Sequence, residues 1–176
     1  MAGSWSDIFS KILPTILDSV GGYFRKQRMR NQLYQEISEN NHKTVVHVAR
    51  CTTIEGFSRG EPLRFVENLG LSFSMWDFYT SDEKRKELLF GLKDAAAIVR
   101  VYEKFKSIDT DSPGYALVRG KVAAAEVDDS LADGSLDRKL YKRVSSKEAW
   151  DYMATLLNGK RKSYRYYLNP LTRPIR

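Results

Sequence analysis

Large apolar residues recur at spacings of three and four over the first two dozen positions, with mostly small polar residues between them. This spacing predicts an amphipathic helix over residues 4–20. Pro14 falls on the polar side of this helix and predicts a kink, and Gly21-Gly22 predicts a stop or a hinge. The large apolar positions of the segment are Trp5, Ile8, Phe9, Ile12, Leu13, Ile16, Leu17 and Val20.

The pattern changes its period further along the chain. Residues 23–39 resume a helical spacing among charged residues. Residues 43–54 are rich in β-branched side chains, which predicts a strand. Residues 115–127 have a mixed period around Gly120, and we expect a strand or a bulged strand there.

Three more helices are expected from their start signals. Pro62 suits the first turn of one helix, and a capping box of Thr80 and Glu83 opens a second. The end of that second helix, residues 96–105, is equally consistent with a strand. Ser145 and Glu148 form another capping box, for a helix closed by Gly159. The tail beyond it alternates apolar and polar residues, which predicts an extended segment.

Together these elements predict the α+β class. We expect a single domain in which helices pack on an antiparallel sheet, preceded by an amphipathic N-terminal helical arm. The arm comprises residues 1–22, and residues 23–176 form the core domain with a basic C-terminal tail.

Composition and charge limit the classes of binding partner but do not identify a single one. A chain of 176 residues that is 42% hydrophobic is typical of a globular domain, and its apolar runs are too short for a transmembrane helix. The net charge of +7 favours acidic partners, either phospholipid or nucleic acid. Residues 126–137 are acidic, whereas the segment from Arg138 to the end is basic, a block pattern that suits an assembling protein or simply solvated faces.

The N-terminal stripe leads into a cluster of cations, namely Arg25, Lys26, Arg28 and Arg30. An apolar stripe followed by cations predicts binding to an anionic membrane surface, since each cation near such a surface contributes about 1 kcal/mol. We therefore assign membrane binding to the apolar stripe together with these four cations. An alternative stays open, in which the stripe packs on the core of its own chain or on a neighbouring copy.

The basic tail mixes cations with aromatic residues, a combination that grips phosphates and stacks on bases. It predicts contact with nucleic acid or a nucleocapsid through Lys160, Arg161, Lys162, Tyr164 and Arg165. The same tail is also consistent with an edge strand that has a charged outer face.

Catalytic and metal chemistry has little support in the sequence. His47, Cys51 and Glu55 follow one another at intervals of four, but on the expected strand they lie too far apart for one metal. No phosphate-binding, dinucleotide-binding, serine-hydrolase or zinc-protease motif occurs in the chain. We therefore expect a protein that is not an enzyme and that uses no cofactor and no metal.

A family resemblance follows from residues 44–120. A β-branched segment (TVVHVARCTTI) leads through an Arg-containing turn (FSRGEPLRF) to Trp76-Asp77, a basic run and LLFGL, and Pro113-Gly114-Tyr115 and Arg119-Gly120 follow. This order resembles the matrix proteins of rhabdoviruses. The chain departs from the animal viruses of that family because it lacks a Lys-rich first arm and has neither a PPxY nor a PTAP motif. It is more similar to a plant-infecting or divergent member.

The resemblance implies a structural role. Such a protein is located at the inner membrane face of the virion and in the host cytoplasm. It binds the membrane, self-associates into a homo-oligomer and condenses a ribonucleoprotein against the envelope. Two other functions stay open from the residues themselves. One is a cytoplasmic helical adaptor that docks a protein partner through its N-terminal segment, and the other is a basic nucleic-acid-binding module.

Overall fold

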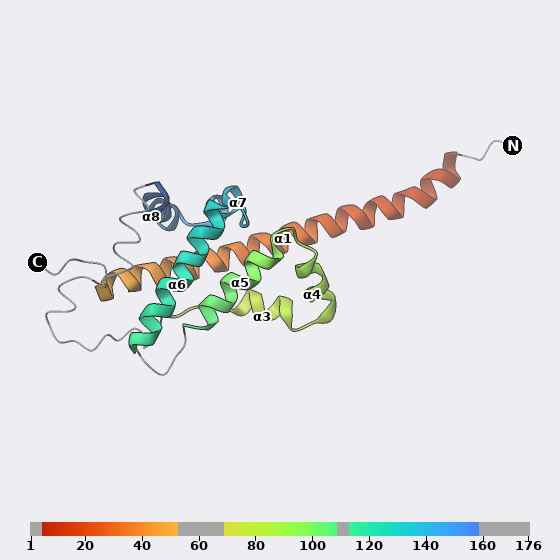
Figure 1. Cartoon of the computed structure of the whole chain (residues 1–176). Helices are drawn as coiled ribbons and strands as arrows, with labels where there is room; N and C mark the ends of the chain where they lie inside the picture. The colour runs from red at the N-terminus through yellow and green to blue at the C-terminus, as the bar shows by residue number, and fades with distance from the viewer. Residues whose placement is uncertain (1–4, 53–68, 109–112, 159–176) are drawn as a thin grey trace, which may run out of the picture.

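The computed structural model describes residues 5–52, 69–108 and 113–158, and these residues are almost entirely helical (Figure 1). The helices are α1 (Trp5–Thr52), α3 (Ser74–Thr80), α4 (Glu83–Phe90), α5 (Ala95–Lys106), α6 (Pro113–Ala132), α7 (Arg138–Val144) and α8 (Lys147–Asn158).

The long helix α1 organises the fold. It contacts every other helix of the described residues, and α5 and α6 also pack against each other (Figure 1). In Figure 1, α7 and α8 lie above α1 while α3 and α4 lie below it, so these two pairs cover opposite sides of the long helix. The N-terminal part of α1 projects beyond the other helices, whereas its C-terminal half runs through the body.

The predicted α+β class is wrong, because the described residues contain no strand. Residues 43–52, expected as a strand, complete α1, and residues 115–127 belong to α6. Within α1, Thr44, Val45 and Val48 are all buried, which is the spacing of one helix face. Tertiary packing of that face outweighs the small preference of β-branched residues for strands.

The stop expected at Gly21-Gly22 is wrong, because α1 is one helix from Trp5 to Thr52 that includes Pro14 and both glycines. Adding a turn to an existing helix costs far less than nucleating a new one. The packed half of α1 is such an existing helix, and it extends through residues that would stop an isolated segment.

Helix boundaries differ from the expected ones in the middle of the chain. Asp82, rather than Thr80, begins α4, since its side chain accepts a hydrogen bond from the backbone N–H of Arg85. The single helix expected from Thr80 is two helices, α4 and α5, separated after Gly91. The predicted alternative of a strand over 96–105 is wrong, because these residues lie in α5.

The last described helix is close to its prediction. The capping box predicts a cap at Ser145, and the cap is instead the next residue: the Ser146 hydroxyl accepts a hydrogen bond from the N–H of Ala149 at 3.1 Å, and α8 begins at Lys147. The helix expected from Pro62 lies outside the described residues up to residue 68. Residues 69–73 are described and are not helical, so the expected continuation to Trp76 is wrong, and Trp76 lies in the separate helix α3. Gly159 and the extended tail also lie outside them.

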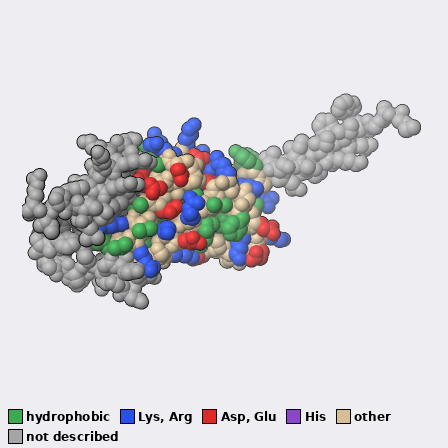
Figure 2. Space-filling model, in the orientation of Figure 1, with side chains coloured by type: hydrophobic (Ala, Val, Ile, Leu, Met, Phe, Trp, Pro, Cys, Tyr) green, Lys and Arg blue, Asp and Glu red, His purple; other side chains and the backbone are tan. Residues whose placement is uncertain are grey.

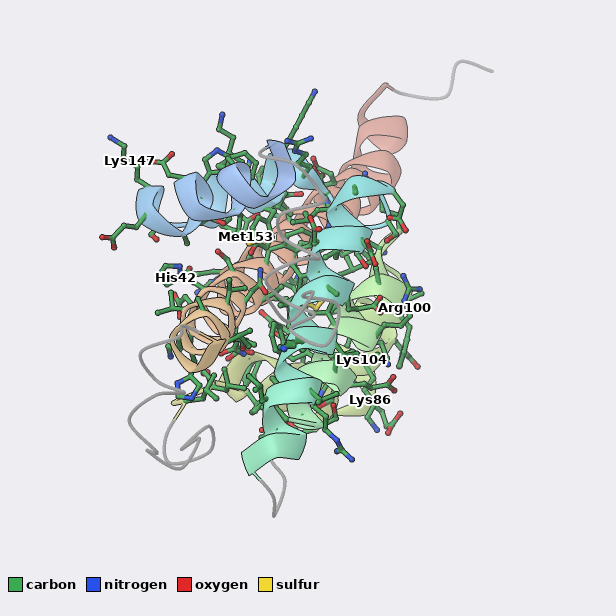
Figure 3. All side chains as sticks on the ribbon, turned by 60° about the vertical axis from the view of Figure 1, so that its left-hand side comes forward. His42, Lys86, Arg100, Lys104, Lys147 and Met153 are labelled. Carbon is green, nitrogen blue, oxygen red and sulfur yellow. The ribbon has the colours of Figure 1, made fainter. Side chains whose placement is uncertain are left out.

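Polar side chains of α1 hold the short helices in place on both sides. On the α3 side, the Asn40 amide exchanges two hydrogen bonds with the backbone of Ser72, at 2.7 and 2.8 Å. On the α8 side, Asn41 donates to Met153 at 3.2 Å, and Figure 3 shows Met153 on α8 beside α1. Such buried polar contacts fix the orientation of each helix, because an unmet partner is costly.

Candidate functional site

Because α1 is one helix, positions in its projecting arm can be assigned to the same side of the helix as positions in its packed half. Five helical turns contain about 18 residues, so positions about 18 apart lie on the same side of a helix. By this rule the apolar positions Ile12, Leu13, Ile16 and Val20 lie on the same side of α1 as Arg30, Asn31, Tyr34 and Ser38. The second set is the part of α1 that faces α7 and its flanking residues.

Three hydrogen bonds fix α7 on that side of α1. The backbone N–H of Asp137 donates to the Tyr34 hydroxyl at 2.7 Å, and Arg143 Nη2 donates to Asn31 Oδ1 at 3.0 Å. The hydroxyls of Ser38 and Ser145 are 2.6 Å apart. The side of α1 that α7 covers in the body is therefore the side that carries the apolar stripe in the arm.

Helix α7 presents a surface of exposed cations on this side. Its sequence RKLYKRV buries Leu140 and Tyr141 and leaves the other long side chains in solvent. We call the exposed residues Arg138, Lys139, Lys142 and Arg143 the α7 cationic surface. Figure 2 shows Lys and Arg side chains standing out along this edge of the body.

The α7 cations are not neutralised locally. Among the described residues, none of the four forms an ion pair with a carboxylate. Two of them, Arg138 and Lys142, instead lie over the ring of Trp150, at 6.0 and 5.4 Å from its centroid. Their positive charge remains available to an anionic partner.

Asp137, the residue that begins α7, holds this helix on the body. Its carboxylate accepts hydrogen bonds from the N–H groups of Lys139 and Leu140 and also contacts Arg30 at 3.3 Å. The backbone bond from Leu140, together with the charge of Arg30, keeps the pKa of Asp137 below its usual value.

A second surface lies on the opposite side of α1. A groove of about 610 Å³ runs between α1, α3 and α4, and we call it the α3–α4 groove. Apolar and aromatic side chains form its floor, namely Met29, Met75, Tyr79 and Leu88. Four cations and one acid stand along its rim, namely Arg25, Arg28, Lys84, Arg85 and Asp82.

The groove is electropositive because its lining carries four cations and one acid. The Asp82 carboxylate accepts the N–H of Arg85 at 3.1 Å, and within the described part of the chain none of the four rim cations forms an ion pair. Burial raises the pKa of Tyr79, and the charges of Arg28 and Arg85 partly oppose that shift. These two arginines therefore act on the same groove-lining hydroxyl, one from α1 and one from α4.

The four cations that the sequence assigned to membrane binding do not form one surface. Arg25 and Arg28 lie at the α3–α4 groove. Arg30 pairs with Asp94 and Asp137, and its side chain is only 12% exposed, so it is not available to lipid. The Lys26 side chain reaches the end of α4, where its Nζ lies close to Gly91: a methyl group placed on the Gly91 Cα would be 3.3 Å from this Nζ.

The other predicted site residues are only partly covered by the structure. The arm positions Trp5 to Val20 are helical in their backbone, and their side chains lie outside what is described. The tail residues Lys160 to Arg165 lie outside the described residues. His47 is helical rather than extended, and no group of three His, Cys, Asp or Glu suited to a metal occurs among the described side chains.

Sequence reasoning missed both cationic surfaces as sites. It treated Arg138 to Arg143 as part of a basic block, although the spacing of Leu140-Tyr141 within RKLYKRV could have shown a short helix with an exposed cationic side. The groove joins residues more than 50 positions apart, which no local pattern reveals.

Comparison with protein-family models, with curated proteins and with solved structures finds no match. None of the described helices combines the length and apolar character needed to cross a membrane.

Proposed function

We propose that this protein is a non-enzymatic assembly protein that binds the surface of an anionic membrane. The apolar stripe of the arm enters the interfacial region, and the α7 cationic surface binds the lipid headgroups. The observation that carries this proposal is the shared side of α1: the stripe positions and α7 both lie on it, so a membrane on that side faces both.

The two elements supply different parts of the binding free energy. Fully burying a large apolar side chain contributes roughly 1.5–3 kcal/mol, and an interfacial helix buries part of each. The arm itself contains only Asp7, Lys11 and Asp18 as charged residues, so it gives no preference for anionic lipid. That preference comes from the four α7 cations, at about 1 kcal/mol each.

Vesicle co-sedimentation tests the electrostatic half. The full chain is titrated with phosphatidylcholine vesicles, with and without phosphatidylserine, and compared with the double variant Lys139→Gln/Lys142→Gln. Loss of about 2 kcal/mol raises the Kd for the anionic vesicles about 30-fold and leaves the weak binding to neutral vesicles unchanged. Equal affinity of the wild type and the variant for anionic vesicles would refute this use of α7.

A matched pair of substitutions tests the arm. Ile16→Asp adds a negative charge to the stripe, whereas Ser10→Asp adds the same charge to the side of α1 that carries Arg28. We expect Ile16→Asp to weaken binding to both kinds of vesicle at least about tenfold, and Ser10→Asp to change it only slightly. Similar losses in both variants would contradict insertion of one defined face.

One observation favours a second candidate function, self-association through the arm. The stripe continues a side of α1 that α7 covers within the body, so helices of a second copy could cover it in the same way. Sedimentation velocity together with vesicle co-sedimentation separates self-association from membrane binding. Self-association alone predicts an oligomer that depends on Ile16 and a chain that does not pellet with vesicles. A matrix role with a nucleocapsid partner stays the prediction that the family resemblance implies, although the strand at 44–52 in that resemblance is helical.

A further inference from the structure

We infer that the α3–α4 groove binds an acidic, amphipathic segment of a partner protein. The segment places apolar side chains on the groove floor and its carboxylates against the cations of the rim. This second site lies on the side of α1 opposite to the surface proposed for the membrane.

The charge of the rim indicates an acidic partner. Arg25, Arg28 and Lys84 are exposed and extend from two different helices, and no described carboxylate neutralises them. Like charges held on facing helices repel each other, so an anionic ligand between them relieves a cost as well as gaining attraction. The arrangement is complementary to carboxylates spaced along a peptide.

The floor indicates a peptide rather than a nucleic acid. The half-buried Met75 and Leu88 line it above the buried Met29, and a flexible methionine side chain such as that of Met75 is typical of surfaces that accept apolar residues. The Tyr79 hydroxyl donates its proton to the Gln32 side-chain oxygen, so that proton and that oxygen are already engaged with each other. Arg85 covers one face of the Phe78 ring at 3.9 Å from its centroid, which leaves that face closed to a stacking base.

A lipid headgroup is the less suitable ligand for geometric reasons. If the arm and α7 lie on a membrane as proposed above, Arg25 and Arg28 face away from it, because they share a side of α1 with Gln32 and Glu36, which contact α3. This step rests on the proposed function, whereas the charge and floor arguments do not.

The direct test is fluorescence anisotropy with the full chain and a labelled synthetic peptide. The peptide is a helix of about five turns, with Leu on one face and Glu on the other. One control peptide replaces each Glu by Gln, and a second replaces each Leu by Ser. We expect saturable binding of the first peptide and at least about tenfold weaker binding of both controls.

Two double variants then locate the site. Arg28→Gln/Lys84→Gln removes two exposed rim cations and is expected to weaken the acidic peptide at least about tenfold. Lys139→Gln/Lys142→Gln removes the same charge from the other side of α1 and is expected to leave peptide binding unchanged. Circular dichroism confirms that both variants keep the helical content of the wild type.

The outcomes separate this inference from the proposed function. No peptide binding, equal loss in both variants, or equal affinity for the Leu→Ser peptide would overturn the groove assignment, even if vesicle binding behaves as proposed. Binding of a single-stranded oligouridine that depends on Arg28 and Lys84, with no peptide binding, would overturn it in favour of a nucleic acid. Vesicle binding that depends on Arg28 and Lys84 would overturn it in favour of a lipid headgroup.

Discussion

Substitution of Glu36 by Gln is expected to destabilise the protein well beyond an ordinary change of charge. Glu36 lies on α1 and is only 4% exposed. Its Oε1 accepts hydrogen bonds from the hydroxyls of Ser72 and Ser74 and from the N–H of Met75, at 2.9, 3.1 and 3.0 Å. Its Oε2 accepts from the N–H of Trp76 at 3.1 Å and from the Tyr102 hydroxyl at 2.8 Å.

This carboxylate acts as the missing cap of α3. Phe73 precedes the helix and provides no side-chain hydrogen bond to it, so the free N–H groups of the first turn depend on Glu36. A negative charge is also favoured there, because the N-terminus of a helix is partly positive. The chain thus begins a short helix with an acid that lies far away in sequence.

The loss of stability depends on which of the hydrogen-bond donors around residue 36 can reorient. In Glu36→Gln the hydroxyl donors can rotate, but the new NH₂ group faces a fixed backbone N–H, and a buried unmet donor costs about 1–3 kcal/mol. Loss of the charge-assisted bonds adds to this cost, while the neutral side chain is easier to bury. We expect a net loss of about 2–3 kcal/mol, which corresponds to a Tm lower by about 4–12 °C for a chain of this size.

Thermal and urea unfolding followed by far-ultraviolet circular dichroism measure this loss. Glu39→Gln is the matched control, because Glu39 is exposed on the same helix and accepts only the Gln35 amide at 3.0 Å. That variant is expected to stay within about 0.5 kcal/mol of the wild type. If the two variants differ by less than that amount, Glu36 is not the cap that the geometry indicates.

Two further predictions concern the attachment of α7 and the backbone. Asp137→Ala removes the cap of α7 and its contact with Arg30, and urea unfolding should show a loss of about 0.5–2 kcal/mol. The pKa of Asp137 is lower in the folded state than in the unfolded chain, so the ionised carboxylate stabilises the fold above its usual pKa. This contribution is lost as the pH falls through the lower folded-state value. The wild type should therefore lose more stability below about pH 4 than Asp137→Ala does. Gly134→Ala should destabilise the protein by about 1 kcal/mol, because Gly134 has a φ of 80°. Gly22→Ala should stabilise it by a similar amount, because Gly22 is helical with open space around it. Differential scanning calorimetry measures both, and a change of Tm in the same direction for the two variants would contradict this reasoning.

The sequence allowed the helical regions with strong periodicity to be predicted, and residues 23–39 and the start near Ser145 are examples. It failed where residues with a preference for strands lie on a buried helix face. The β-branched side chains of Val45 and Val48 favour a strand, but burial against other helices decides their conformation. The segment 115–127 failed for a different reason, its mixed period around Gly120: in α6 even its small residues Ala116, Ala123 and Ala124 are buried, so no clear apolar stripe marks the helix.

The sites were harder to predict than the helices because a helix distributes neighbouring residues around its axis. Arg25, Lys26, Arg28 and Arg30 form one cluster in sequence, yet they point to a groove, to the end of α4 and to a buried ion pair. Conversely, the α7 cations are more than 100 residues from the arm and share its side of α1 only through the bonds to Asn31 and Tyr34. Grouping by sequence position was therefore misleading at the residues that matter most.

The rigid helix α1 explains how one small chain could serve two partners at once. Its α7 side continues into the apolar stripe, and its α3 side carries the groove, so ligands on the two sides do not compete for space. Arg30 and Glu36 do not contact either proposed ligand, but they fix α7 and α3 on opposite sides of α1 through Asp137 and the first turn of α3. The separation of the two surfaces thus depends on buried polar contacts of the body. Loss of the Arg30 contact or of the Glu36 contact should let α7 or α3, respectively, change its orientation, although the charges of that surface remain.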